Sequence, residues 1–228
     1  MNVEGIQNHL RHISVSATLP GSHIHYLRKL KAEGVEPNVI YDIGACILQW
    51  TKVAAELWPD AQIILFDAFE HSEFLFKESG RPYHLGVLSD MDDKEVKFYQ
   101  NEIHPGGNSY YKEWNDGVFP PDRFRICRAR TIDSIVRERG FPKPDLVKID
   151  VQGAEKDILA GAVETFADAK HLIVEMQHQQ YNLGAPMVEE TRPYIESLGW
   201  TCVAPLFCNN GPDGDYHFIR NPVTAVVP

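Results

Sequence analysis

Apolar segments typical of buried strands alternate with helix-like segments along most of this chain. The strand-like segments are rich in β-branched residues and lie at residues 39–43, 62–66, 83–88, 146–151 and 172–176. The helix-like segments occur at residues 48–57, 69–77, 132–139, 154–159 and 187–198. This alternation predicts βαβ units, and continuous apolar runs favour strands buried on both faces. We therefore expect an α/β fold with a doubly wound, mostly parallel sheet.

Both ends of the chain depart from this alternation. Residues 200–207 and 216–219 resemble two strands joined by the turn-rich sequence NNGPDGD, which predicts an antiparallel C-terminal strand pair. Residues 1–35 are polar with helical apolar spacing, so we expect an N-terminal helical cap followed by a main domain over residues 36–228. Within the cap, His23 and His25 are expected on a solvated helix face.

A long segment without expected secondary structure interrupts the chain at residues 101–125. Loops of this length inside compact domains are usually functional or disordered. Tyr110, Tyr111 and Trp114 favour a loop that covers a substrate, because aromatic rings can stack on the apolar face of a sugar.

Charge and cysteine content exclude several classes of protein. The 228 residues include 32 acidic and 22 basic side chains, and the net charge of −10 disfavours nucleic acid and anionic membranes as partners. The four cysteines form no CxxC pair, and no stretch has the length and apolarity of a membrane span or a signal peptide. We expect a soluble, cytoplasmic protein with reduced thiols, whose oligomeric state the sequence leaves open.

Two acidic strand ends have a spacing typical of nucleotide-binding folds. The first strand runs into Asp42 and turns at Gly44, where a nucleotide-like ligand could meet bare backbone, although an ordinary strand-to-helix turn is the alternative. Asp67 ends the next strand, where a carboxylate can bind both ribose hydroxyls. A helix N-cap role for Asp67, or ribose binding by the nearby Glu70, are the other interpretations.

The segment VKIDVQGAEKDILAGA, residues 147–162, concentrates polar groups at the end of a strand. Lys148 and Asp150 lie near the end of the strand, and Gln152 and Glu155 follow in the turn and the first helical turn. Ligands of open parallel sheets collect outside these strand ends, so we expect a site here. A salt bridge for Lys148 and a favourable charge at the helix start for Glu155 are the structural alternatives.

These segments resemble the FkbM family of S-adenosylmethionine-dependent methyltransferases. The strongest match is LVKIDVQGAEKDILAGA, and YDIGACILQWT is similar to the methyl-donor turn, more usually DIGANIGQWT. GVLSDMDDKEVKFY, NSYY, TIDSI and IVEM match in order, so the resemblance covers roughly residues 36–220. The chain departs from the pattern at Cys46 (usually Asn), Leu48 (usually Gly) and Asp67 (commonly Glu). The resemblance implies the Rossmann-like fold of class I methyltransferases.

The resemblance also implies a binding site for S-adenosylmethionine. Its cofactor-binding residues would be Asp42, Gly44, Ala45, Cys46, Asp67, Ala68, Leu88, Ser89, Ser109, Asp150 and Gln152. Within this set, Asp67 would hold the ribose, and Leu88 and Ser89 would flank the adenine. Asp150 and Gln152 would face the methyl group and the acceptor.

Methyl transfer to a hydroxyl benefits from a general base. The candidate catalytic residues are Asp150, His104, Glu175 and His178, and simple solvation is the alternative for His104. Asp150, Glu175 and His178 also follow two strands expected to be neighbours, and their oxygen and nitrogen atoms could hold Mg²⁺ or Mn²⁺. A hydrogen bond from Glu175 to the backbone or to Lys148 is the alternative to a metal.

The function implied by the resemblance is O-methylation of a hydroxyl of a sugar or glycoconjugate by in-line displacement. The expected partner is thus a small-molecule or glycan acceptor, with no nucleic acid and no membrane. An NAD-dependent oxidoreductase is a second hypothesis, although GACIL lacks the later glycines that bring a pyrophosphate close. A catalytically impaired donor-binding protein is a third, motivated by Cys46 and Leu48.

Overall fold

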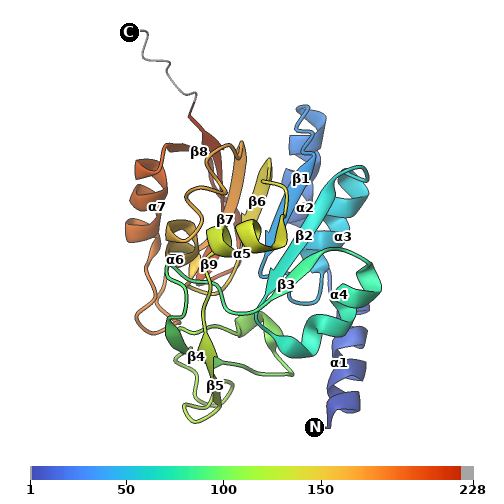
Figure 1. Ribbon diagram of the computed structural model, residues 1–228, viewed down its shortest axis with the longest axis vertical. Helices are drawn as coiled ribbons and strands as arrows, with labels where there is room; N and C mark the ends of the chain where they lie inside the picture. Colours follow the sequence, from blue (N-terminus) through green and yellow to red (C-terminus); the bar gives the residue numbers. More distant parts are fainter. Residues whose placement is uncertain (1, 222–228) are drawn as a thin grey trace.

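A seven-stranded sheet forms the centre of the computed structural model, which describes residues 2–221 (Figure 1). Its order is β3-β2-β1-β6-β7-β9-β8. The strands are β1 (Val39–Ile43), β2 (Gln62–Asp67), β3 (Tyr83–Leu85), β6 (Leu146–Ile149), β7 (His171–Gln177), β8 (Trp200–Asn209) and β9 (Asp213–Arg220). The first five strands in this order are parallel, and β9 pairs antiparallel with both β7 and β8. This confirms the predicted mostly parallel sheet and its antiparallel C-terminal pair.

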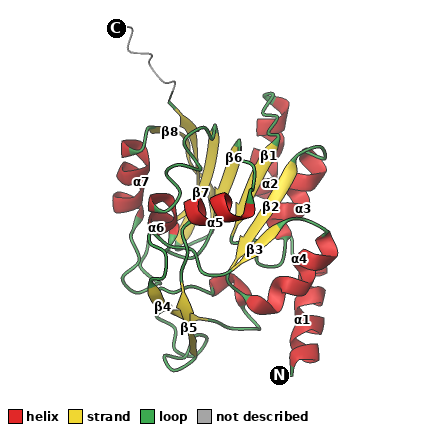
Figure 2. Cartoon of the chain, in the orientation of Figure 1, coloured by secondary structure: helices red, strands yellow, loops and turns green. Residues whose placement is uncertain are grey.

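Helices cover both faces of the sheet, as a doubly wound fold requires (Figure 2). Successive residues of a strand point to opposite faces, so Ile63 packs into one apolar core and Ile64 into the other. The core around Ile63 includes residues of α1 (Val3–Ser16), α2 (Gly21–Ala32), α3 (Gln49–Leu57) and α4 (Glu73–Ser79). The core around Ile64 includes residues of α5 (Ile132–Arg139), α6 (Glu155–Ala160) and α7 (Val188–Ser197).

The N-terminal segment forms two helices that pack directly against the sheet. Leu10 of α1 and Leu27 of α2 are fully buried, in the same apolar core as Ile40 and Ile63. The two helices therefore contribute to one of the two cores that flank the sheet.

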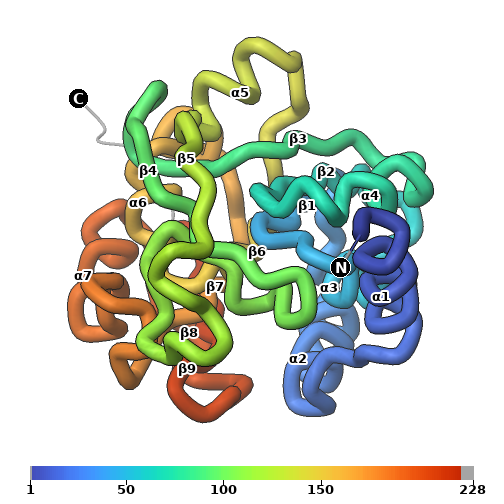
Figure 3. The backbone as a smooth tube through the Cα atoms, turned by 90° about the horizontal axis from the view of Figure 1, so that it is seen from below, coloured from blue at the N-terminus to red at the C-terminus, as the bar shows by residue number. Residues whose placement is uncertain are grey.

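A second, two-stranded sheet lies beside the main one and was not predicted from the sequence. It pairs β4 (Glu95–Tyr99) with β5 (Phe124–Arg128) in antiparallel register. Both strands are short and have charged residues, Glu95, Lys97 and Arg128, among their exposed positions, so their apolar signal is weak. The long segment between them contains a single 3₁₀ turn, η2 (Pro105–Gly107), and a second such turn, η1 (Glu70–Ser72), precedes α4. Figure 3 shows the green segment between β4 and β5 crossing the view of β6 and β7.

In the part of the chain that the structure describes, no helix combines the length and apolarity needed to cross a membrane. All four cysteines are free thiols.

Candidate active site

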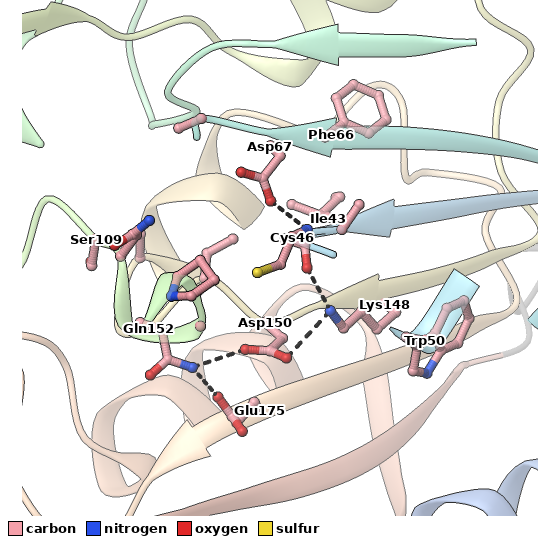
Figure 4. A pocket seen from close by; sticks show the side chains of 18 of the residues that line it. Ile43, Cys46, Trp50, Phe66, Asp67, Ser109, Lys148, Asp150, Gln152 and Glu175 are labelled. Carbon is pink, nitrogen blue, oxygen red and sulfur yellow. Dashed lines mark hydrogen bonds and ion pairs between the residues drawn. The ribbon is translucent and has the colours of Figure 1, made fainter. Parts of the chain in front are cut away.

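A cavity of about 400 Å³ opens at the carboxyl ends of the parallel strands (Figure 4). Residues at or just after the ends of four strands line it, namely Ile43, Asp67, Asp150 and Glu175. This edge is where ligands bind in open α/β sheets. The volume is within the range of roughly 300–1,000 Å³ that is typical of small-molecule sites.

The turn after β1 depends on Gly44 because no side chain fits there. Its φ is +82°, and a Cβ atom would lie 1.8 Å from the carbonyl oxygen of Asp150. The glycine thus lets the turn pack against the end of β6, while Ala45 and Cys46 line the cavity. Cys46 and Leu48 also have positive φ, 46° and 66°. Asn and Gly, usual at these two positions in the FkbM pattern, adopt that conformation at lower cost.

Asp67 fixes the backbone around the cavity with both carboxylate oxygens. Oδ2 accepts a hydrogen bond from the Cys46 amide at 2.7 Å, and Oδ1 accepts one from the Phe69 amide at 2.7 Å. Burial raises the pKa of Asp67, against the effect of these two amides. Each oxygen keeps a second lone pair for a ligand hydroxyl. Glu70, the alternative carboxylate, is exposed, pairs with Arg125 at 2.9 Å and does not line the cavity.

Lys148 joins the ends of β1 and β6 from below the cavity. Its ammonium lies 3.4 Å from Asp42 Oδ1 and 3.3 Å from Asp150 Oδ2, and it donates to the Gly44 carbonyl at 3.1 Å. Although burial favours the neutral amine, Asp150 and Asp42 raise the pKa of Lys148. Asp42 is fully buried, also bonds to Thr51 and does not line the cavity. Its expected contact with a cofactor is therefore replaced by a role in positioning Lys148.

Gln152 bridges the two carboxylates that were predicted to be catalytic. Its Nε2 donates to Asp150 Oδ1 at 3.0 Å and to Glu175 Oε2 at 2.7 Å. Its Oε1 lies 2.7 Å from the hydroxyl of Tyr181. Burial opposes ionisation of Asp150, but Lys148 lowers its pKa overall. Burial and then the charge of Asp150 raise the pKa of Glu175 well above its usual value.

Glu155 holds the turn between β6 and α6 rather than a ligand. Its Oε1 accepts hydrogen bonds from the amides of Val151 and Gly153, both at 3.1 Å. The residue is 4% exposed, and burial raises its pKa to about 7. The structural alternative for this residue, a carboxylate at a helix start, is the one that the geometry supports.

The apolar wall of the cavity combines predicted residues with others that were missed. Ala68, Leu88 and Ser109, which were predicted to bind the cofactor, line it. Ser89 does not, because it is fully buried behind the wall and donates to Asp90 at 2.9 Å. Other lining residues were not predicted from the sequence, namely Phe66, Val87, Phe98, Ala154 and Ile158. The strand-end position of Phe66 and the neighbourhood of Val87 to Leu88 were the available signals, whereas Phe98 lies on the unpredicted β4.

The aromatic residues of the long loop are arranged differently from the sequence-based expectation. Of the three, Tyr110 lines the cavity. Its hydroxyl and that of Tyr111 both bond to Asp157 Oδ2 of α6, at 2.7 and 3.2 Å. Trp114 is 63% exposed and does not line the cavity. These contacts tie the loop to α6, and Tyr110 joins Phe66 and Phe98 in the cavity lining.

The two predicted catalytic histidines lie outside the cavity lining. His104 is exposed at the start of η2. His178 lies in the bend just after β7, where its Nε2 is 2.8 Å from the Tyr216 hydroxyl. The proposed metal set of Asp150, Glu175 and His178 is therefore not brought together, and Asp150 and Glu175 remain as candidate bases.

Within the described residues, a different group of side chains does have the spacing of metal ligands. It consists of His23, Cys208 and Asp215. His23 is 4% exposed, so the expectation of a solvated position was wrong, whereas His25 is exposed. The indole N–H of Trp50 can only donate, and it does so to His23 Nε2 at 3.0 Å. His23 Nδ1 must then carry the ring proton, and it donates to Asp215 Oδ2 at 3.1 Å. Both ring nitrogens are thus engaged, which disfavours a metal here.

Comparison with known proteins identifies the family. The sequence model of the methyltransferase FkbM domain matches residues 42–201. The chain belongs to the FkbM methyltransferase family. It is 25% identical over 195 residues to the 2-O-methyltransferase NoeI of Sinorhizobium fredii, covering 77% of this chain and 78% of that one. It is 27% identical over 159 residues to the hexuronic acid methyltransferase AglP of Haloferax volcanii, covering 66% and 60%.

Solved methyltransferase structures share the fold of this FkbM protein. A putative O-methyltransferase from Klebsiella pneumoniae aligns with a TM-score of 0.50 at 14% identity, covering 96% of this chain and 89% of that one. TomG from Streptomyces achromogenes, solved with S-adenosylmethionine, gives a TM-score of 0.50 at 12% identity and the same coverage. The fold and the family together make this chain an S-adenosylmethionine-dependent methyltransferase of class I.

Proposed function

We propose that this FkbM protein methylates a hydroxyl group of a sugar or glycoconjugate, with S-adenosylmethionine as the donor. The observation that carries the proposal is the single cavity in which the Gly44 turn, Asp67 and the carboxylates Asp150 and Glu175 meet. Two curated relatives are named as a 2-O-methyltransferase and a hexuronic acid methyltransferase, which supports oxygen and sugar as the acceptor class.

The residues at the β1 and β2 ends fit the donor. The turn at residues 44–46 presents backbone to the cavity, Asp67 keeps lone pairs for the ribose hydroxyls, and Leu88 and Phe98 offer apolar surface for the adenine. S-adenosylmethionine supplies a methyl group that its sulfonium already activates for displacement. The protein therefore mainly has to align the acceptor and exclude water, which is worth roughly 7–11 kcal/mol.

Asp150 and Glu175 have different roles toward the acceptor hydroxyl in this proposal. Lys148 keeps Asp150 ionised at the floor of the cavity, where it can accept a hydrogen bond from the acceptor. Glu175, with its raised pKa, has the higher proton affinity and is the residue that takes the proton of the acceptor hydroxyl. Gln152 holds both carboxylates in place through its amide group.

Calorimetry with S-adenosylmethionine, S-adenosylhomocysteine and NAD tests the donor site. We expect the two sulfur compounds to bind, and Asp67→Ala to weaken them by about 1–3 kcal/mol through loss of charge-assisted hydrogen bonds. Urea unfolding of the same variant separates this effect from loss of the two amide contacts. Glu70→Gln, a neighbouring carboxylate outside the cavity, is the matched control and should leave donor affinity unchanged. A preference for NAD would contradict the proposal.

Mass spectrometry of reactions with the donor and a panel of glycans tests the transfer itself. We expect a neutral glycoside in the panel to gain the mass of one methylene group. Donor binding without transfer to any glycan would favour a donor-binding protein with an impaired site.

A further inference from the structure

One end of the cavity, where His23 lies 3.1 Å from Asp215, is built largely by residues outside the matched segment 42–201. Leu19 lies between α1 and α2, and His23 lies on α2. Asp213 and Asp215 belong to β9, which three strands separate from β2 in the sheet. Glu175, at the end of β7, joins these residues to the reacting region. The flanking segments of this chain therefore shape the place where an acceptor has to lie.

The chemistry of this end is acidic and offers no available cation among the described residues. Asp150, Glu175, Asp213 and Asp215 all line the cavity. Lys148 is the one lysine or arginine in the described lining, and it is already paired with Asp42 and Asp150. A sugar carboxylate or phosphate would thus find no basic partner of the kind that such groups require.

A buried carboxylate oxygen at this end lacks a partner. Asp213 is 7% exposed, and its Oδ2 lies 2.6 Å from the Tyr181 hydroxyl. Its Oδ1 has no hydrogen-bond partner within the described residues. An unpaired buried acceptor of this kind is costly, and a hydroxyl group of a bound ligand would satisfy it. This oxygen, rather than the acidic cluster alone, marks the end of the cavity as a binding site.

The carboxylates already disfavour additional negative charge. Burial, followed by the charges of Asp150 and Asp213, raises the pKa of Glu175, and burial also raises the pKa of Asp213. An anion placed among them would meet the same penalty, whereas hydroxyl groups would donate to the carboxylate oxygens.

We propose that this end of the cavity is the acceptor subsite and that it takes an uncharged sugar unit, bound through its hydroxyl groups, while rejecting sugar acids and phosphorylated sugars. The inference rests on the proposed function and narrows its substrate class. It sets this chain apart from its relative AglP, whose name gives a hexuronic acid as the acceptor.

Matched sugar pairs provide the test, because a methyl glucoside and a methyl glucuronoside differ only at C6, and a galactose pair does the same. Each sugar is titrated by calorimetry into protein saturated with S-adenosylhomocysteine and is also assayed for methyl transfer. We expect the neutral member to bind and to react at least tenfold better than the uronate, which corresponds to about 1.4 kcal/mol. Equal or better use of the uronates would overturn the inference and leave the proposed function intact.

Two variants connect the selectivity with the named residues. Asp213→Asn and, separately, Asp215→Asn should lower the neutral-to-uronate ratio at least threefold, because each removes one charge from the subsite. Asp60→Asn removes one charge from an exposed position outside the cavity and should leave the ratio unchanged. Neutral binding without methyl transfer would contradict the proposed function but keep the charge selectivity, and absence of binding by every sugar would overturn both.

Discussion

Neighbouring carboxylates at the strand ends have pKa values shifted in opposite directions, and the roles proposed for them depend on this difference. Asp150 lies against Lys148 and stays ionised, whereas Glu175 is buried beside Asp150 and retains its proton to higher pH. Pairs of titratable groups with diverging pKa values are typical of acid–base chemistry. In the proposed reaction, Asp150 is the fixed negative charge and Glu175 is the group that exchanges protons.

Removal of the proton-accepting carboxylate should change the pH profile of the reaction. We expect kcat/KM of the wild type to rise with pH as Glu175 loses its proton. Glu175→Gln should lower the rate by about 10²–10⁴-fold and abolish this rise. Asp150→Asn should instead move the rise to lower pH, because Asp150 contributes to the raised pKa of Glu175. The test is to measure kcat/KM of each variant between pH 5 and pH 9. An unchanged pH dependence in Glu175→Gln would mean that another residue is the base.

Glu155 should make stability depend on pH without taking part in catalysis. Its pKa rises from 4.5 to about 7 on folding, so the folded state holds the proton more tightly. The stabilisation that this provides is complete below pH 4.5 and is lost as pH rises through 7. Glu155→Gln, which keeps an acceptor for the two amides, should therefore gain up to about 3 kcal/mol relative to the wild type between pH 4.5 and pH 8. Urea unfolding across this range measures the difference, and a constant difference would refute it.

At the scale of elements, the donor turn shows how a strand end and a glycine together create a site. The turn follows β1 and packs on the end of β6, so a Cβ at Gly44 would collide with the Asp150 carbonyl. The close approach of the Asp150 carbonyl and the positive φ thus each favour glycine at position 44. A ligand that binds at this turn therefore contacts backbone that the rigid sheet holds in place.

Alanine substitution separates these two constraints. Gly140→Ala, at φ +65° with open space around it, should cost only the left-handed conformation, about 1–2 kcal/mol. Gly44→Ala carries the same backbone cost plus the collision, so we expect a loss of about 3 kcal/mol or more and no donor binding. Denaturant unfolding and calorimetry compare the two variants. Equal losses would show that the β1 turn can relax away from β6.

The sequence predicted the elements that carry continuous apolar runs, and it missed those that do not. β1 and α5 match their expected ranges, because buried strands and amphipathic helices have clear periodicities. β4 and β5 were missed because they are short and half exposed. In the site, Asp67 and Asp150 were predictable from their strand-end positions. His23 and Asp213 were not, because the contacts that bring α2 and β9 to the cavity are long-range.

Across the whole molecule, the N-terminal helices behave as part of the main core. Leu10 is fully buried among residues of the sheet, whereas Val15 on the same helix is 80% exposed. We propose that residues 1–35 and the main domain unfold together. This coupling also places His23 at the cavity, so the N-terminal helices and the acceptor subsite are structurally linked.

Substitutions in α1 test this coupling. Leu10→Ala should destabilise the entire protein by about 2–5 kcal/mol and shift one cooperative transition, as expected for a large cavity in a core. Val15→Ala should change stability by less than about 0.5 kcal/mol. Unfolding followed by both far-UV circular dichroism and tryptophan fluorescence makes the measurement. A separate early transition confined to the Leu10→Ala variant would mean that the helices unfold independently.

The buried position of the Cys46 thiol bears on a side reaction, in which the cysteine would take the methyl group of the proposed donor. Cys46 lines the cavity, where a thiolate would be a far better nucleophile than an alcohol and would capture the alkyl group. Burial, reinforced by Asp67 and Asp150, raises the pKa of Cys46 and so favours the protonated thiol, which is a weak nucleophile. With the donor bound as proposed, this protonation would suppress transfer of the methyl group to the cysteine.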